Sequence, residues 1–238
     1  MRPISIGTLV FGAVLACFPA TAMAVTLASG GSVLLAGTTA AAEPELAGTV
    51  VNDDVQQQLA KIGGEDSLLA IGTSLQNRVV RSDLDGTLIF APRLLTTFNN
   101  TGSDFLVDRF ELTGFGDFAV DANYRTDGLG DRGPNAASRS GDGDVMTFDF
   151  LFPLFGGNLV QEPQESSYFL SLNTEATAFS LDGRASIFAR HLGSPGETFR
   201  FDFANIAVPV IAPVPLPASW LLLLGALGIT GLARRRTT

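Results

Sequence analysis

The sequence is poor in the residues that carry most redox and catalytic chemistry. Among 238 residues there is one cysteine, one histidine and one tryptophan. A single cysteine excludes a disulfide-stapled mini-protein and a cysteine-rich metal site. Charged residues account for only 16%, whereas hydrophobic residues account for 46%. The chain is therefore no disordered acidic tail, because such tails lack the apolar residues for a core.

The charges that are present are distributed unevenly. The formal net charge is -9, and this acidic surplus predicts no nucleic-acid partner, because it repels phosphate. All acidic residues lie between Glu43 and Asp202, whereas Arg2 and Arg234 to Arg236 lie near the two ends. Basic, apolar ends around an acidic middle indicate a soluble domain between two membrane-directed segments.

The N-terminus has the three parts of a secretory signal peptide. Arg2 precedes an apolar run over residues 4–18, and Ala22 and Ala24 form a small-x-small cleavage site. We predict a signal peptide over residues 1–24, cleaved before Val25, with the Sec translocon and signal peptidase as partners. An uncleaved N-terminal anchor is the alternative.

Cys17 lies inside this predicted signal peptide. Val14 to Cys17 loosely resembles a lipobox, in which the cysteine is lipidated, but Leu15 fits poorly where a small residue is usual. We expect Cys17 to be discarded with the signal peptide, which leaves a mature protein without cysteine or disulfides.

The C-terminus is the most informative stretch. A proline-rich linker is predicted over residues 207–217, followed by an uncharged apolar stretch over 218–233. As a helix this stretch spans roughly 24 Å against a hydrocarbon core of ~30 Å, a gap that arginine snorkelling can close. We therefore predict a transmembrane helix with a basic cytoplasmic end over 218–238, with Trp220 at the outer interface.

These C-terminal residues resemble a known sorting signal. The segment Val214-Pro215-Leu216-Pro217-Ala218, then Trp220, an apolar helix and Arg234-Arg235-Arg236, is similar to the VPLPA-CTERM signal, a PEP-CTERM variant of Gram-negative bacteria. The resemblance covers about the last 25 residues. It implies an exosortase as partner, inner-membrane anchoring facing the periplasm, and then transfer to the cell envelope, surface or exterior. A plain single-pass anchor is the alternative.

The middle, residues 25–206, is predicted to be one mainly β domain, an antiparallel β-sandwich of jelly-roll type. Alternating apolar and polar residues predict strands around Phe148 to Phe152 and Phe199 to Phe203. Asp85-Gly86 and Asp182-Gly183 predict two tight hairpins. Further strands are predicted over 88–90, 94–98, 105–107, 110–112, 118–120 and 168–172.

One helix is also predicted in the middle. Val55, Leu59 and Ile62 share a helical face, Asp53 or Asp54 can cap its start, and Gly63-Gly64 can end it. The segment over residues 28–47 is weakly patterned, and we expect it to be partly loose.

The segment from Asp121 to Asp144 is rich in oxygen ligands of the kind that Ca²⁺ prefers. It is not an EF-hand loop, because Arg125 stands where a ligand belongs. A long solvated loop is the favoured interpretation and a calcium loop the alternative. The candidate ligands are Asp121, Asn123, Asp127, Asp131, Asp142 and Asp144.

Signals for catalysis are few. His191, the only histidine, is expected at a strand end or turn, because it precedes the turn-forming residues 193–196. No serine-nucleophile elbow accompanies it, which argues against a catalytic triad. Residues 128–133 match the glycine pattern of dinucleotide-binding sites. That pattern requires a helix directly after it, and Pro134 stands there instead, so we reject a dinucleotide site. Asn99-Asn100-Thr101 fits a glycosylation sequon, and a turn is its expected use.

The sequence leaves three functions open. The first is a non-enzymatic exported protein with a structural, adhesive or exopolysaccharide-associated matrix role, without a cofactor. The second is a β-sandwich module that binds polysaccharide or Ca²⁺. The third is an exported glycoside hydrolase that uses two carboxylates.

Overall fold

The computed structural model describes residues 25–64, 66–158, 163–193 and 197–212. Within these ranges the chain is mainly β, as expected, and its helical structure is one 3-10 turn, η1 (Pro44–Leu46). No helix in them has the length and apolar character that a membrane crossing requires. The predicted signal peptide and the sorting segment from residue 213 onward lie outside the described residues.

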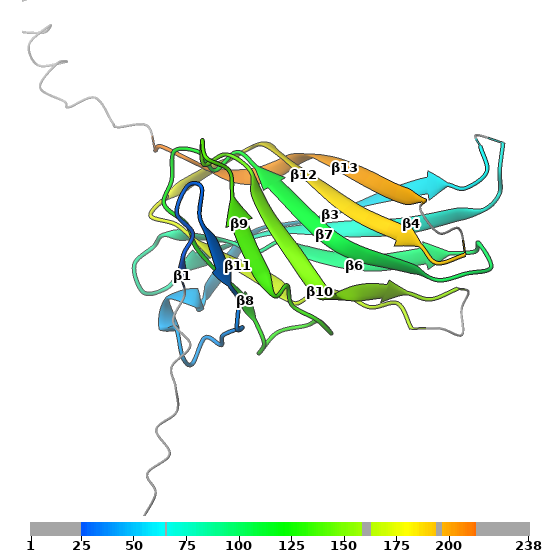
Figure 1. The fold of residues 1–238 in the computed structure, drawn as a ribbon. Helices are drawn as coiled ribbons and strands as arrows, with labels where there is room; N and C mark the ends of the chain where they lie inside the picture. The colour runs from blue at the N-terminus through cyan, green and yellow to red at the C-terminus, as the bar shows by residue number, and fades with distance from the viewer. Residues whose placement is uncertain (1–24, 65, 159–162, 194–196, 213–238) are drawn as a thin grey trace, which may run out of the picture.

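The strands build two antiparallel sheets (Figure 1). The first has seven strands in the order β1-β8-β11-β5-β4-β3, with β6 also paired to β4, and the second has six in the order β13-β12-β7-β10-β9-β2. The strands are β1 (Val25–Thr26), β2 (Ser32–Leu34), β3 (Gly48–Lys61), β4 (Ala70–Ser82), β5 (Leu88–Phe90), β6 (Arg93–Asn99), β7 (Phe105–Thr113), β8 (Asp121–Arg125), β9 (Ala136–Arg139), β10 (Met146–Gly156), β11 (Phe169–Asn173), β12 (Ala178–His191) and β13 (Thr198–Val210).

One hydrophobic cluster joins the two sheets. Leu75 and Phe90 contribute to it from the first sheet, and Phe110 and Phe148 contribute from the second. The ring of Phe115 meets that of Phe90 edge-on, at 5.3 Å between centroids. Burying such large apolar side chains is the main stabilising contribution, about 1.5–3 kcal/mol for each side chain.

The period-two patterns place the expected residues in this core, with one exception. Phe201 and Phe203 are buried, and Asp202 between them is exposed. In β10, however, Phe148 is buried and Phe152 is 63% exposed. The pairing of β10 with β7 shifts between Asp149 and Leu154, and this irregularity turns Phe152 out of the core.

The helix predicted over residues 53–64 is wrong. Residues from Asp53 to Lys61 belong to β3 and pair continuously with β4. Val55 and Leu59 were expected on one helical face, but residues four apart also share one face of a strand. The segment pairs as a strand because β4 offers it a continuous ladder of backbone partners.

The two hairpin predictions have different outcomes. Asp85-Gly86 lies in a turn between β4 and β5, although the connection is the segment 83–87 rather than the two-residue hairpin predicted. Gly86 has φ 78°, and the Ser82 N–H donates to the Thr87 carbonyl at 2.9 Å. Asp182-Gly183 forms no turn, because β12 runs through it as one strand. Pairing with β13 shifts at Gly183, and a Cβ there would press on Val208 and the Ile206 carbonyl. Close approach of backbones, rather than a turn, thus requires this glycine.

Three other boundaries differ from the prediction. β13 continues past residue 206 to Val210, so Pro209 belongs to a strand rather than to the linker. The segment over residues 28–47 is not loose, because it contains β2 and η1 and buries Leu35 and Leu46. Finally, residues 118–120 precede β8 and form no strand of their own.

Candidate ligand-binding face

The predicted calcium segment is not one long loop, because β8 and β9 lie within it. Among the described residues, no group of three or more His, Cys, Asp or Glu side chains is placed to hold a metal ion. Each predicted ligand instead accepts a hydrogen bond from the protein: Asp121 from Thr26, Asn123 from the Gly37 N–H, Asp127 from Arg125, Asp131 from the Ser166 N–H, Asp142 from Ser140 and Asp144 from the Gly114 N–H.

A buried guanidinium joins the loops of this region. Arg139 is 6% exposed and donates to four backbone carbonyls, at 2.7 to 3.1 Å. Burial lowers the pKa of Arg139, and the nearby Asp144 carboxylate partly opposes that shift. An internal cation thus ties together backbone segments near Asp144, one of the ligands of the alternative calcium-loop interpretation. The four carbonyls belong to Leu27, Phe115, Phe118 and Gly143.

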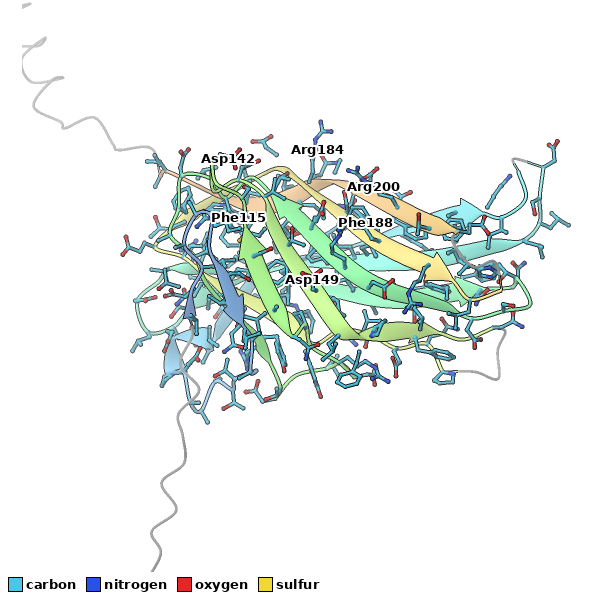
Figure 2. All side chains as sticks on the ribbon, in the orientation of Figure 1. Phe115, Asp142, Asp149, Arg184, Phe188 and Arg200 are labelled. Atoms are coloured by element: carbon cyan, nitrogen blue, oxygen red, sulfur yellow. The ribbon has the colours of Figure 1, made fainter. Side chains whose placement is uncertain are left out.

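The outer face of the second sheet gathers charged and aromatic side chains in cross-strand rows. Phe188 of β12 pairs with Arg109 of β7 on one side and with Arg200 of β13 on the other. Asp149 of β10 extends this row beyond Arg109. The two guanidiniums lie 4.1 and 5.6 Å from the centre of the Phe188 ring. Figure 2 shows Asp149, Arg184, Phe188 and Arg200 on this side of the sheet.

A hollow of about 430 Å³ lies along this face, within the size range of small-ligand sites. Ser186 is at its centre, with Glu111 opposite it on β7 and Asp202 opposite it on β13. The remaining lining residues are Thr113, Val145, Arg184, Ala185, Arg200, Phe203 and Ala204. We refer to it below as the β12 hollow.

Most charges of the β12 hollow are already paired. Asp202 accepts a hydrogen bond from Ser186 at 2.6 Å and from Arg200 at 2.7 Å, and these contacts hold its pKa below the usual 3.8. Asp202 is therefore ionised at neutral pH and is poorly suited to be the acid of a glycoside hydrolase, whose pKa must be raised. Arg184, by contrast, makes no side-chain hydrogen bond or ion pair within the described part of the chain. Its guanidinium retains its donors for a ligand.

A second hollow, of about 210 Å³, lies on the first sheet beside Phe169. Arg78 and Arg125 line it, but each is already paired with an aspartate, Asp53 at 2.8 Å and Asp127 at 2.7 Å. Because both cations are neutralised, this hollow is the less suited of the two to an anionic ligand.

His191 lies at the end of β12, the strand-end position predicted for it, and is 6% exposed. Its Nε2 is 2.8 Å from the Thr101 hydroxyl, which donates to the Asn99 side chain at 2.8 Å. Asn99 is buried and ends β6. These hydrogen bonds join the end of β12 in the second sheet to the end of β6 in the first.

Of the predicted processing and sorting residues, Val25 alone is among those that the structure describes. Val25, the predicted first residue of the mature protein, begins β1 and pairs with Ala122. Ala22 and Ala24 lie outside the described residues, as do the predicted sorting residues over 214–218, 220 and 234–236.

The β12 hollow was not predicted from the sequence. Its residues come from separate strands, and strand order and register align them. The alternation of Arg184, Ser186 and Phe188 was a usable signal, but the glycine before it was interpreted as a hairpin turn.

Comparison with known protein families, with curated proteins and with solved structures found no match to this chain.

Proposed function

We propose that this chain is an exported, non-enzymatic protein of the cell envelope or surface, with a structural, adhesive or exopolysaccharide-associated role. In this proposal a β-sandwich domain is carried across the inner membrane by the signal peptide and anchored by the C-terminal helix. The supporting observation is the order of the chain: a signal-like N-terminus, one single-core domain, a proline-rich neck and a sorting-like tail.

Membrane topology tests this proposal. Alkaline phosphatase, which is active only outside the cytoplasm, is inserted just before the proline neck, and a cytoplasm-only reporter is inserted there in a parallel strain. We expect phosphatase activity and no signal from the second reporter. A control that lacks residues 2–18 must reverse the two signals. Cytoplasmic location of the full-length fusion would refute the proposal.

Intact mass of the protein from its native host tests the processing steps. We expect a mass that begins at Val25, with a second cut near the Pro-rich motif when exosortase is present. An N-terminus that still carries residues 1–24, or a lipid mass on Cys17, contradicts the predicted cleavage.

A second candidate function is the binding of an acidic polysaccharide at the β12 hollow. It is favoured by Arg184, a cation without an ion-pair partner in the described structure, which lies opposite Thr113 and its hydroxyl. A guanidinium is suited to a sugar carboxylate because it offers two parallel N–H donors.

Affinity electrophoresis tests this candidate. We expect the protein to be retarded by polygalacturonate and not by neutral dextran, and Arg184→Gln to lose most of the retardation. Arg78→Gln, a charge-matched change on the other sheet, is the control and should keep it. Equal retardation of both variants would indicate attraction unrelated to the hollow.

A further inference from the structure

Among the residues that the structure describes, the edge strand of the first sheet is long and pairs on one side only. β3 ends the strand order, and every residue from Gly48 to Lys61 is exposed or half-exposed. Figure 1 shows β3 running with β4 toward the end of the molecule opposite η1. Proteins usually shorten or cover such an edge because its free N–H and C=O groups attract another strand.

The register of β3 with β4 shows which backbone groups point to the free side. The carbonyls of Ala70 and Arg78 accept bonds from Asn100 and Ala91, on the far side of β4 from β3. Ala70 and Arg78 lie directly opposite Lys61 and Asp53 on β3. Because Ala70 and Arg78 use their backbone groups on the other side of β4, these are non-hydrogen-bonded pairs. Lys61 and Asp53 therefore direct their own N–H and C=O groups away from β4, to the free edge. The β3–β4 register has no shift between Asp53 and Lys61. Every second residue of this stretch therefore points its backbone groups to the free edge, which adds Val55, Gln57 and Leu59.

These five residues are self-complementary about Gln57. When a second β3 runs antiparallel with Gln57 opposite the partner's Gln57, Val55 lies opposite the partner's Leu59. In the same register Asp53 lies opposite the partner's Lys61. Apolar meets apolar in the Val55–Leu59 pairs, and acid meets base in the Asp53–Lys61 pairs, where Asp53 also keeps its bond from Arg78 in its own sheet. No like charges lie directly opposite one another. Shifting the register by two residues, the smallest shift that keeps the same backbone groups facing the partner, moves Asp53 away from the partner's Lys61.

The surroundings of β3 leave this edge accessible. The inward-facing Gln56 is held by the other sheet, since its amide donates to the Ala204 carbonyl at 2.9 Å. The outward side chains of Val55 and Leu59 are each 58% exposed. The pairing irregularity of β3 lies between Val50 and Asn52, outside the self-complementary stretch.

From this we propose that the free edge of β3 pairs with the β3 of a second copy, antiparallel and centred on Gln57. The two copies then share one continuous sheet, and the two-fold axis closes the assembly as a dimer. This inference is independent of the ligand proposed for the β12 hollow.

Disulfide trapping in the full chain, carrying Cys17→Ser and kept in mild detergent, tests the register. Directly opposite residues have Cα atoms ~5.5 Å apart in such a pair, within the ~4.4–6.8 Å range of disulfides. Gln57→Cys should therefore give a cross-linked dimer on mild oxidation. Val55→Cys is the matched control: its two copies lie four positions apart, about 13 Å, and should stay monomeric on a non-reducing gel. Cross-linking of Val55→Cys, of both variants equally, or of neither overturns the proposal.

Sedimentation without cross-links tests the charge pairing. The protein with its native β3 should dimerise reversibly with concentration, and Lys61→Glu should weaken dimerisation about tenfold, because symmetry repeats the new like-charge contact twice. Asp53→Lys combined with Lys61→Glu should recover most of the loss, and thermal unfolding checks that each variant is folded. A monomer at every concentration, or an unchanged dissociation constant for Lys61→Glu, overturns the proposal even if the double variant does not fold.

Discussion

Arg139 shows how one side chain can organise several loops. It is buried, and its guanidinium donates to three carbonyls that precede β8 in the sequence and to the Gly143 carbonyl that follows it. Lysine keeps the charge but has no planar fork to reach four acceptors at once. A buried carbonyl left without a donor costs about 1–3 kcal/mol.

We expect Arg139→Lys to lower the free energy of unfolding by about 3 kcal/mol or more, because several buried carbonyls lose their donor. Chemical denaturation followed by circular dichroism measures it. Arg190→Lys, in an exposed ion pair with Asp108, is the control and should change stability by less than about 1 kcal/mol. Similar losses for the two variants would mean that Arg139 has no special structural role.

The ion pair of Glu165 makes stability depend on pH. Two contacts from Arg132, at 2.7 and 2.9 Å, hold the pKa of Glu165 below its usual 4.5. A carboxylate whose pKa is lower in the folded state stabilises the fold above its unfolded pKa. That contribution is lost as the pH falls from about 4.5 through the lower, folded pKa.

We therefore expect Glu165→Gln to be less stable than the parent protein at pH 7 and to lose less further stability on acidification below about pH 4.5. Urea unfolding between pH 7 and pH 3 measures both effects. The exposed Asp182→Asn is the comparison variant. Parallel pH profiles for Glu165→Gln and the parent would contradict the assignment.

At the scale of the element, β10 contains the same residue type in two environments. Phe148 is fully buried against Phe110, with 6.1 Å between ring centroids, whereas Phe152 lies within the pairing irregularity and is 63% exposed. Their difference comes from the register of β10, since both satisfy the same alternation in sequence.

We expect Phe148→Ala to cost about 3–5 kcal/mol of unfolding free energy, and Phe152→Ala to cost less than about 1 kcal/mol. The first change leaves a cavity between the sheets, and the second removes a side chain that is mostly in water. Equilibrium denaturation of both variants tests this. If Phe152→Ala proves equally costly, Phe152 is buried in the protein in solution.

Elements are also joined by polar side chains. Asn77 of β4 is buried, donates to the Asn205 carbonyl at 3.2 Å and accepts from the Ala207 N–H at 3.2 Å. Asn205 has a positive φ of 58°, a conformation that asparagine tolerates better than most residues. This contact satisfies the backbone of β13 where its ladder with β12 is irregular.

At the scale of the whole molecule, the acidic composition does not translate into a metal cluster within the described residues. The predicted calcium ligands accept hydrogen bonds from the protein, and the charge of Arg139 lies near one of them, Asp144. The acidic side chains instead lie at the surface or accept hydrogen bonds from nearby groups of the protein.

We therefore expect millimolar calcium to leave the melting temperature of the full chain unchanged relative to the same concentration of magnesium. A ligand that binds only the folded state would raise it. A calcium-specific rise would show that the region binds calcium after rearranging its hydrogen bonds, and loss of that rise in Asp142→Asn would locate the site there.

Local alternation and turn chemistry were enough to predict much of this fold. The β character, the Asp85-Gly86 turn and the burial of Phe201 and Phe203 all follow from neighbours in sequence. The prediction failed where a distant strand decided the outcome. Residues 53–61 became a strand because β4 pairs with them, and Gly183 lies within a strand because β13 passes close to it.

The same division holds for the candidate site. Composition and the order of apolar and basic segments determined by themselves the prediction of export and sorting, because membrane insertion depends on local hydrophobicity and charge. Only the tertiary structure decided that Arg184, Ser186 and Asp202 line one hollow, that Arg139 holds several loops, and that β3 has a free edge. Strand order and register bring together residues that are far apart in the chain, and no local pattern specifies them.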